Sequence, residues 1–141
     1  MNEQVRRIID TAKNESFRMW HDHIGTEHLL LAIAVDNDSV AAKALTENGA
    51  SFDQLARQAD QTLARGKVQG HAERPQTPRA HEVIKIAARE AARYGKSYIE
   101  IEHVALALLK QEGSAARELL TKLGVDIDKV IEIVERDAAK R

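Results

Sequence analysis

The stretch IGTEHLLLAI, residues Ile24–Ile33, places a glutamate and a histidine directly before an unbroken apolar run. The same arrangement returns 75 residues later as IEIEHVALAL, residues Ile99–Leu108. A match of this kind at a fixed offset indicates a tandem repeat. We therefore expect two copies of one structural unit.

The offset of 75 residues aligns the two halves of the chain without a gap. Identical residues then meet along the whole unit: Ile9 and Ile84, Ala12 and Ala87, Glu15 and Glu90, Arg18 and Arg93, Leu45 and Leu120, and Gly49 and Gly124. Two copies are too few for an open solenoid, so a closed pseudo-twofold arrangement is expected.

Each copy shows the apolar spacing of four helices, and no window alternates as a strand does. The long first helix of each copy repeats apolar residues at i, i+3, i+4 and i+7. Residues suited to cap the helices stand at several of their starts: Asn2, Thr26 and Ser51 in one copy and Thr77 and Asp126 in the other. The third helix of each copy is expected to run from about Ser39 to Asn48 and from Ser114 to Leu123. Pro78 follows Thr77, as is usual for the first helical position. The predicted fold is an all-α, eight-helix, pseudo-twofold bundle.

The predicted organisation is a single domain over residues 1–141. Repeat one covers 1–64 and repeat two covers 77–141, with a linker at 65–76 whose sequence RGKVQGHAERPQ interrupts every periodic pattern. Because each repeat has only about sixty ordered residues, we expect the two halves to bury apolar surface against each other.

Composition limits the classes of function. The 21 Lys and Arg nearly balance the 22 Asp and Glu, which argues against the basic field of a nucleic-acid-binding protein. Cysteine is absent, so disulfides and thiolate chemistry are excluded, and a reducing compartment fits. The N-terminus lacks a signal-peptide core, and no segment reaches the roughly 18 apolar residues of a membrane span. We expect a cytoplasmic protein, monomeric in isolation, without membrane contact.

The duplicated units that carry IGTEHLLLAI and TPRAHEVIKIA resemble the Clp N-terminal domain. This double-repeat module precedes the ATPase rings of Clp-type AAA+ unfoldases, and the likeness is strongest to the ClpC and ClpA kind. The resemblance implies an eight-helix fold without enzymatic activity or cofactor. It also implies a role in receiving substrate or adaptor proteins for the unfoldase ring, in cis or in trans.

The chain lacks the G-x-x-x-x-G-K-[ST] loop of a nucleotide-binding motor. Two interpretations therefore stay open. The chain is the front domain of a larger unfoldase, or it is a stand-alone paralogue that competes with the unfoldase for substrates, adaptors or small-molecule ligands.

The resemblance further implies a pair of phosphoarginine pockets. In each, a glutamate binds the guanidinium while the start of the first helix of the same repeat holds the phosphate. Transferred to this sequence, Glu102 is expected to act with Thr77, and Glu27 with Asn2, with Thr26 supplying a capping hydroxyl.

Two departures from the family pattern weaken the likeness of these pockets. Glu100-Ile101 replaces the usual Gly-Thr before the second glutamate, which adds a negative charge near the expected phosphate. Met1-Asn2 replaces the usual Phe-Thr at the start of the first repeat. Docking of peptides or adaptors without phosphoarginine therefore remains an alternative.

Purely structural explanations also exist for the Glu-His pairs. A glutamate in the first turn of a helix is stabilised by the helix dipole. His28 and His103 are expected to pack beside the core, with one ring nitrogen bonded to a neighbouring carbonyl. Trp20 is expected to cover the edge of the core.

The segment HDHIGTEH raises the question of a metal site. It offers several potential ligands: His21, Asp22, His23, Glu27 and His28. Repeat two reads KSYIEIEH at the same place and retains only Glu102 and His103. We therefore expect surface histidines in a loop and no metal.

Overall fold

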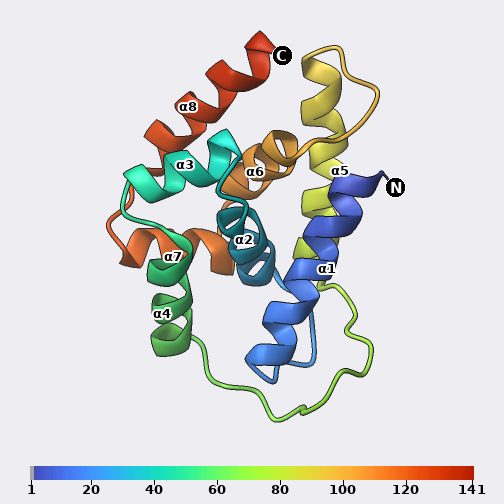
Figure 1. Cartoon of the computed structure of the whole chain (residues 1–141), viewed down its shortest axis with the longest axis vertical. Coiled ribbons are helices and arrows are strands. Elements are labelled where there is room, and N and C mark those ends of the chain that lie inside the picture. Colours follow the sequence, from blue (N-terminus) through green and yellow to red (C-terminus); the bar gives the residue numbers. More distant parts are fainter. Residues whose placement is uncertain (1) are drawn as a thin grey trace.

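The computed structural model describes residues 2–141, so the expected departure at Met1 lies outside the described part. Eight α-helices follow one another in that range (Figure 1). Ile24 and Gln76 form an isolated β-bridge, and residues 2–141 contain no strand. Their bounds are α1 Glu3–Arg18, α2 Thr26–Val35, α3 Val40–Glu47, α4 Phe52–Thr62, α5 Pro78–Arg93, α6 Ile101–Lys110, α7 Ala115–Lys122 and α8 Ile127–Lys140. The predicted eight-helix, all-α fold is confirmed.

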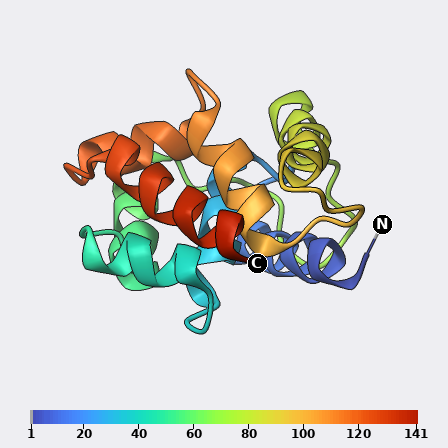
Figure 2. The same ribbon diagram turned by 90° about the horizontal axis from the view of Figure 1, so that it is seen from above.

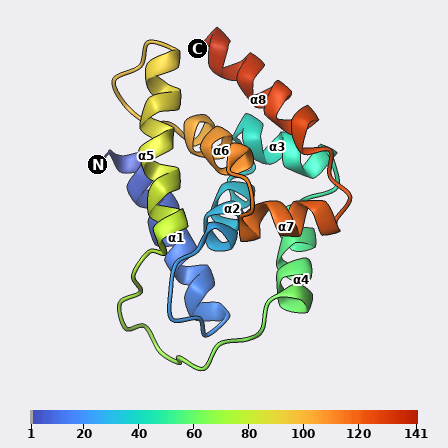
Figure 3. The same ribbon diagram turned by 180° about the vertical axis from the view of Figure 1, so that it is seen from behind.

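The helix contacts are reciprocal under exchange of the two repeats. Helix α1 packs on α2 as α5 packs on α6, and α1 meets α6 as α5 meets α2. Likewise α2 contacts α7 as α6 contacts α3, and α4 contacts α7 as α8 contacts α3. Figures 1 and 3 show the long helices α1 and α5 at one side, α2 and α6 in the centre, and α3, α4, α7 and α8 at the other side. This reciprocity is the pseudo-twofold relation expected from the repeat.

Helices α2 and α6 form the centre of the core because both are apolar around almost their whole circumference. Leu29, Leu30, Leu31 and Ile33 of α2 are each at most 1% exposed, and most of α6 is buried as well. Burial of one such side chain stabilises the fold by roughly 1.5–3 kcal/mol. In the view from above, α8 crosses over the centre of the molecule (Figure 2).

The predicted helix caps are confirmed at every position except one. The side-chain oxygens of four predicted caps accept the backbone N–H of the third residue of their helix: Asn2, Ser51, Thr77 and Asp126. Ser39 and Ser114 cap α3 and α7 in the same way. The prediction for Thr26 is wrong, because Gly25 is the N-cap of α2. Thr26 Oγ1 instead accepts the Ala116 amide of α7 at 3.2 Å, so its hydroxyl joins the two repeats.

The segment between the repeats is held against repeat one along its length. Arg74 is only 4% exposed, and its guanidinium donates to the carbonyls of His21, Val68, Gly70 and Ala72. The predicted linker therefore wraps the end of α1 while it spans the distance from α4 to α5. None of the helices that the structure describes is both long and apolar enough to cross a membrane.

Candidate functional site

The starts of the long helices lie next to the glutamates of the opposite repeats. Helix α1 has 16 residues, so its two ends are about 24 Å apart. Helix α2 begins shortly after α1 ends, which places Glu27 at the end of α1 remote from Asn2. The expected pairing of Asn2 with Glu27 is therefore wrong, and the length of the helix is the reason.

Asn2 lies instead beside the start of α6, where Glu102 is found. Its Nδ2 donates to the carbonyl of Ile99 at 2.6 Å while its Oδ1 caps α1. Two residues along, Gln4 Oε1 accepts the Ile101 amide at 3.0 Å. These bonds join the starts of α1 and α6 into one site, which we call the Glu102 pocket.

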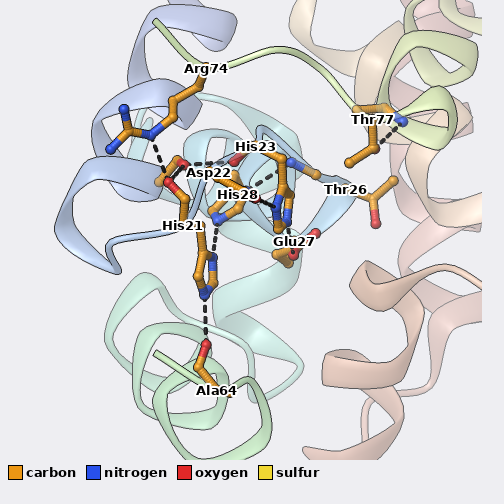
Figure 4. Close-up of polar contacts among 12 residues, drawn as sticks. His21, Asp22, His23, Thr26, Glu27, His28, Ala64, Arg74 and Thr77 are labelled. Atoms are coloured by element: carbon orange, nitrogen blue, oxygen red, sulfur yellow. Dashed lines mark hydrogen bonds and ion pairs between the residues drawn. The ribbon is translucent and has the colours of Figure 1, made fainter. Parts of the chain in front are cut away.

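Thr77 is joined in the same way to the start of α2, where Glu27 is found. The Thr77 amide donates to the Ile24 carbonyl at 2.9 Å, and the Ile24 amide donates to the Pro75 carbonyl at 2.8 Å. The expected pairing of Thr77 with Glu102 is thus wrong as well. We call the site at the starts of α2 and α5 the Glu27 pocket (Figure 4).

The Glu102 carboxylate is almost fully buried, yet one of its oxygens makes no hydrogen bond within residues 2–141. The side chain is 3% exposed, and Oε1 has an ion-pair partner, Arg141 Nε, at 3.5 Å. Burial raises the pKa of Glu102, and the nearby Arg141 guanidinium offsets part of that rise. Glu100 meets the same guanidinium at 3.6 Å. The pocket therefore already holds one arginine side chain of the chain itself.

A cavity of about 260 Å³ lies beside Glu102. Its walls come from α1, α6, the segment after α2, and the end of α8: Gln4, Arg7, Ile8, Asp36, Asp38, Ser39, Glu100, Ile101, Glu102 and Arg141. Four carboxylates against two guanidinium groups make the lining acidic. A cationic group is therefore the ligand type that this cavity favours.

The Glu27 carboxylate is buried against the backbone of its own helix start. A Cβ at position 25 would lie 2.1 Å from Glu27 Oε1, so the absence of a side chain at Gly25 permits this position. Glu27 Oε2 lies 3.4 Å from His23 Nε2. In repeat two the residue that corresponds to Gly25 is Glu100. A side chain is therefore present at the position where repeat one has none.

His28 and His103 act as helix caps. His28 Nδ1 accepts the Gly25 amide at 2.8 Å, and His103 Nδ1 accepts the Glu100 amide at 2.9 Å. The expected burial is confirmed, but the partner is an amide N–H where a carbonyl was expected. Burial lowers the pKa of His28 to about 3, and it also lowers the pKa of His103. The repeated histidine therefore works as a neutral hydrogen-bond acceptor.

The other histidines of HDHIGTEH are not arranged as expected. His21 is 6% exposed and points inward, where its Nδ1 lies 2.8 Å from His28 Nε2 and its Nε2 lies 2.8 Å from the Ala64 carbonyl. The prediction of surface histidines is thus wrong for His21. His23 is partly buried and lies over Glu27 (Figure 4).

Comparison with known proteins agrees with this architecture. The model of the family described as "Clp repeat (R) N-terminal domain" matches residues 1–104 and 76–140. The chain belongs to this family.

Curated relatives of this Clp N-terminal domain include two bacterial proteins. The Bacillus subtilis "Negative regulator of genetic competence ClpC/MecB" and the Oceanobacillus iheyensis "Chaperone protein ClpB" are each 32% identical over 127 residues. Each match covers 90% of this chain but 16% of the relative. The chain therefore corresponds to a small part of the length of these relatives.

Solved structures with the same fold include two N-terminal domains. That of the chaperone ClpD from Arabidopsis thaliana gives a TM-score of 0.80 at 18% identity, covering 97% of this chain and 93% of that one. That of Hsp104 from Candida albicans gives 0.79 at 17% identity, covering 100% and 93%. At these identities the likeness concerns the fold.

Two residues of the Glu102 pocket in this Clp N-terminal domain were missed by the sequence analysis. Arg141 and Gln4 stand far from Glu102 in the sequence, and neither belongs to a repeated motif. The ending VERDAAKR reads only as a charged helix terminus, and nothing in it indicates which carboxylate Arg141 meets. The 97-residue separation of Gln4 and Ile101 likewise gives no local signal.

Proposed function

We propose that this Clp N-terminal domain receives substrate or adaptor proteins for a Clp AAA+ ring, attached in cis or acting in trans. It performs no chemistry of its own. In this proposal the Glu102 and Glu27 pockets bind arginine side chains, including those that carry a phosphate. The observation that supports it most is the Arg141 guanidinium at the buried carboxylate of Glu102.

The guanidinium part of the ligand is well matched by the Glu102 pocket. A buried carboxylate with an oxygen that makes no hydrogen bond gains most from a donor that is planar, forked and permanently charged. Arg141 is 42% exposed and lies 3.5 Å from Glu102 and 3.6 Å from Glu100, whereas its shortest bond, at 2.9 Å, is to Asp137 of α8. An incoming arginine can therefore replace it at the two glutamates at modest cost. Glu100 adds a second acceptor on the same side.

The phosphate part of the ligand is better matched by the Glu27 pocket. Position 25 there is a glycine where the Glu102 pocket has Glu100, so no carboxylate repels the phosphate from that position. The start of α5 offers the hydroxyl of Thr77 and the positive end of the helix dipole. We therefore expect phosphoarginine to favour the Glu27 pocket and unmodified arginine to favour the Glu102 pocket.

A titration followed by two-dimensional amide NMR tests this proposal. Phosphoarginine is expected to shift residues 25–28 and 77–80, and arginine is expected to shift residues 99–103. The variants Glu27→Gln and Glu102→Gln should each abolish the shifts in their own pocket alone. Phosphoserine serves as the control ligand, since it lacks the guanidinium. Absence of shifts in both pockets would remove the arginine proposal.

The link to an unfoldase ring is tested separately. A Clp ring that lacks its own front domain is assayed for substrate degradation with this chain fused to it and with the chain added in solution. Restored degradation in either form supports the proposal, and the form that works distinguishes cis from trans. Failure of both forms contradicts the proposed role.

A further inference from the structure

The cavity beside Glu102 carries more negative charge than one arginine ligand can balance. Its lining has four carboxylates and two guanidinium groups: Asp36, Asp38, Glu100, Glu102, Arg7 and Arg141. A ligand with a single guanidinium that displaces Arg141 leaves the excess of two negative charges unchanged. One arginine side chain therefore satisfies only part of this lining.

The four carboxylates stand as two pairs on different segments of the cavity wall. Glu100 and Glu102 belong to the start of α6, whereas Asp36 and Asp38 belong to the segment between α2 and α3. Arg141 forms ion pairs with the first pair, at 3.6 Å and 3.5 Å. The second pair forms no ion pair with any residue in 2–141, and Asp36 Oδ1 accepts only the Asp38 amide, at 3.3 Å. The cavity therefore has a second place where a cation can bind.

Arg7 does not neutralise the second pair. Its Nη2 lies 3.9 Å from Glu3 Oε1, one turn away on α1, and both of these side chains are largely exposed. Asp36 and Asp38 are exposed as well. A ligand cation can therefore reach them without displacing a side chain of the protein.

The buried Glu102 carboxylate distinguishes this cavity from an ordinary solvated acidic surface. The side chain is 3% exposed, and Oε1 accepts no hydrogen bond within residues 2–141. Burial raises the pKa of Glu102, and repulsion from Glu100 and Asp137 adds to the rise. A buried carboxylate oxygen without a donor is costly, so a cationic donor that enters the cavity stabilises it.

The twofold-related Glu27 pocket has none of the three added carboxylates. The corresponding positions there are neutral: Gly25 for Glu100, Gln111 for Asp36 and Gly113 for Asp38. The repeat therefore folds without a carboxylate at any of these positions, so the three acidic residues are not needed for the architecture.

An arginine of the chain itself occupies the matching place in repeat two. Arg79 stands where repeat one has Gln4, and its Nη1 donates to the Glu112 carbonyl at 2.8 Å. The segment between α6 and α7 thus already has a guanidinium beside it. The segment that carries Asp36 and Asp38 instead shares its cavity with the neutral side chain of Gln4.

We propose that the Glu102 pocket selects protein segments with two cationic side chains close together in the sequence. One guanidinium replaces Arg141 at Glu100 and Glu102, and the second cationic side chain binds at Asp36 and Asp38. This inference rests on the proposed binding of arginine in the Glu102 pocket, and it adds the class of substrate segment to that proposal.

The expected pattern in the ligand is Arg-x-Arg or Arg-x-Lys. In an extended segment the side chains of residues i and i+2 point to the same side, roughly 6.5–7 Å apart, so both can enter one cavity. Lysine is suitable at the second position, because exposed carboxylates attract a point charge as well as a planar fork.

Two blocked peptides without terminal charges test the inference: Gly-Arg-Gly-Arg-Gly and Gly-Arg-Gly-Gln-Gly. Each is titrated into the 141-residue chain and followed by two-dimensional amide NMR, at about 0.01 M ionic strength to limit screening. Both peptides should shift residues 99–103, and the dibasic peptide alone should also shift residues 36–38. We expect the dibasic peptide to bind about fivefold more tightly, which is the effect of one further ion pair at exposed carboxylates.

A double variant identifies the carboxylates responsible. In Asp36→Asn/Asp38→Asn the acceptor atoms stay and only the charges are lost, so the preference should fall to the small statistical advantage of two arginines. The control is Asp10→Asn/Asp128→Asn, which changes the net charge equally at exposed residues outside the cavity lining. The control should keep the full preference. Circular dichroism checks that both double variants are folded.

The outcomes separate this inference from the proposed function. Equal affinities of the two peptides for the wild-type chain would overturn the dibasic preference and leave arginine binding intact, whereas absence of shifts at 99–103 with either peptide would overturn both. A preference that persists in Asp36→Asn/Asp38→Asn, or that is lost equally in the control, would show attraction to the whole surface and also overturn it. Spermidine that binds as tightly as the dibasic peptide would assign the cavity to free polyamines and contradict selection of a protein segment.

Discussion

The Nε atom of Arg141 lies 3.5 Å from the buried carboxylate of Glu102, so the end of α8 partly occupies the pocket at the start of α6. An ion pair with a partner as exposed as Arg141 contributes about 0.2–1 kcal/mol. Replacing Arg141 removes this internal competitor.

We therefore expect Arg141→Ala to raise the affinity of the Glu102 pocket for arginine by up to about fivefold, which corresponds to 1 kcal/mol. The affinity of the Glu27 pocket should stay constant. Arg136→Ala, which removes an exposed arginine paired within α8 to Glu132, is the control. NMR titration of the three proteins gives both affinities. An equal change in both pockets would show that Arg141 acts on the fold as a whole.

Glycine at position 25 permits the observed place of the Glu27 carboxylate, because a Cβ there would come within 2.1 Å of Glu27 Oε1. The backbone at Gly25 has φ −106°, which alanine adopts readily. We expect Gly25→Ala to displace the Glu27 side chain and to lower ligand affinity in the Glu27 pocket at least tenfold. The free energy of unfolding should fall by about 1 kcal/mol, since a flexible side chain can move aside.

The control for this prediction is Glu100→Ala at the corresponding position of repeat two. A side chain is already accommodated there, so the Glu102 carboxylate should not be displaced. Amide and histidine ring signals of residues 23–28 report the displacement directly. If Gly25→Ala leaves those signals and the affinity unchanged, the proposed position of Glu27 is wrong.

Arg74 joins the linker to the segment between α1 and α2, because its guanidinium donates to three linker carbonyls and to the carbonyl of His21. Methionine keeps the length of the side chain but cannot donate, so Arg74→Met leaves buried carbonyls without their donor. We expect the free energy of unfolding to fall by about 2–4 kcal/mol, measured by chemical denaturation.

The matched control is Arg65→Met, which removes an exposed arginine that stacks on Trp20 at 4.2 Å. A loss of at most about 1 kcal/mol is expected there. Hydrogen exchange should show that protection of the Gly66 and Val68 amides falls in Arg74→Met. Equal losses in the two variants would contradict a specific role for Arg74.

The sequence predicted the fold well because the relevant signals are local and occur twice. Helical periodicity, cap residues and the 75-residue offset all depend on neighbours in sequence, and each repeat supports the assignment of the other. Thr26 was misassigned as a cap because its true partner, the Ala116 amide, is 90 residues away and belongs to the other repeat.

The site was predicted less well because it depends on how the repeats dock. The sequence offered Asn2, Thr77, Glu27 and Glu102 as candidate residues, but which of them lie together follows from the packing of α1 on α6 and of α5 on α2, which no local pattern shows. The burial of His21 was missed for the same reason. Its environment includes the Ala64 carbonyl and Arg74. Both residues follow α4 in the sequence and are therefore distant from His21 along the chain.

Glu90 provides a prediction of pH dependence at the contact between α5, α6 and α8. Burial alone would raise its pKa, but hydrogen bonds from Lys110 at 2.7 Å and Arg93 at 3.1 Å outweigh burial, and the pKa is lowered. A carboxylate whose pKa is lower in the folded state contributes stability above its unfolded pKa of about 4.3. That contribution is lost as pH falls through the folded pKa.

We therefore expect Glu90→Gln to lower the free energy of unfolding at pH 7 by about 1.5–3 kcal/mol, the range for hydrogen bonds to charged groups. The difference from wild type should shrink as the pH falls from 5 toward 3. Glu15→Gln is the matched control, because in repeat one Val35 replaces Lys110 and only Arg18 bonds to the carboxylate on the same helix. Its loss at pH 7 should be smaller, since the Glu15 carboxylate bonds to one cation whereas the Glu90 carboxylate bonds to two. Urea denaturation from pH 3 to pH 8 provides the measurement. A difference between Glu90→Gln and wild type that stays constant over that range would mean that the Glu90 charge does not stabilise the packing of α5 against α6.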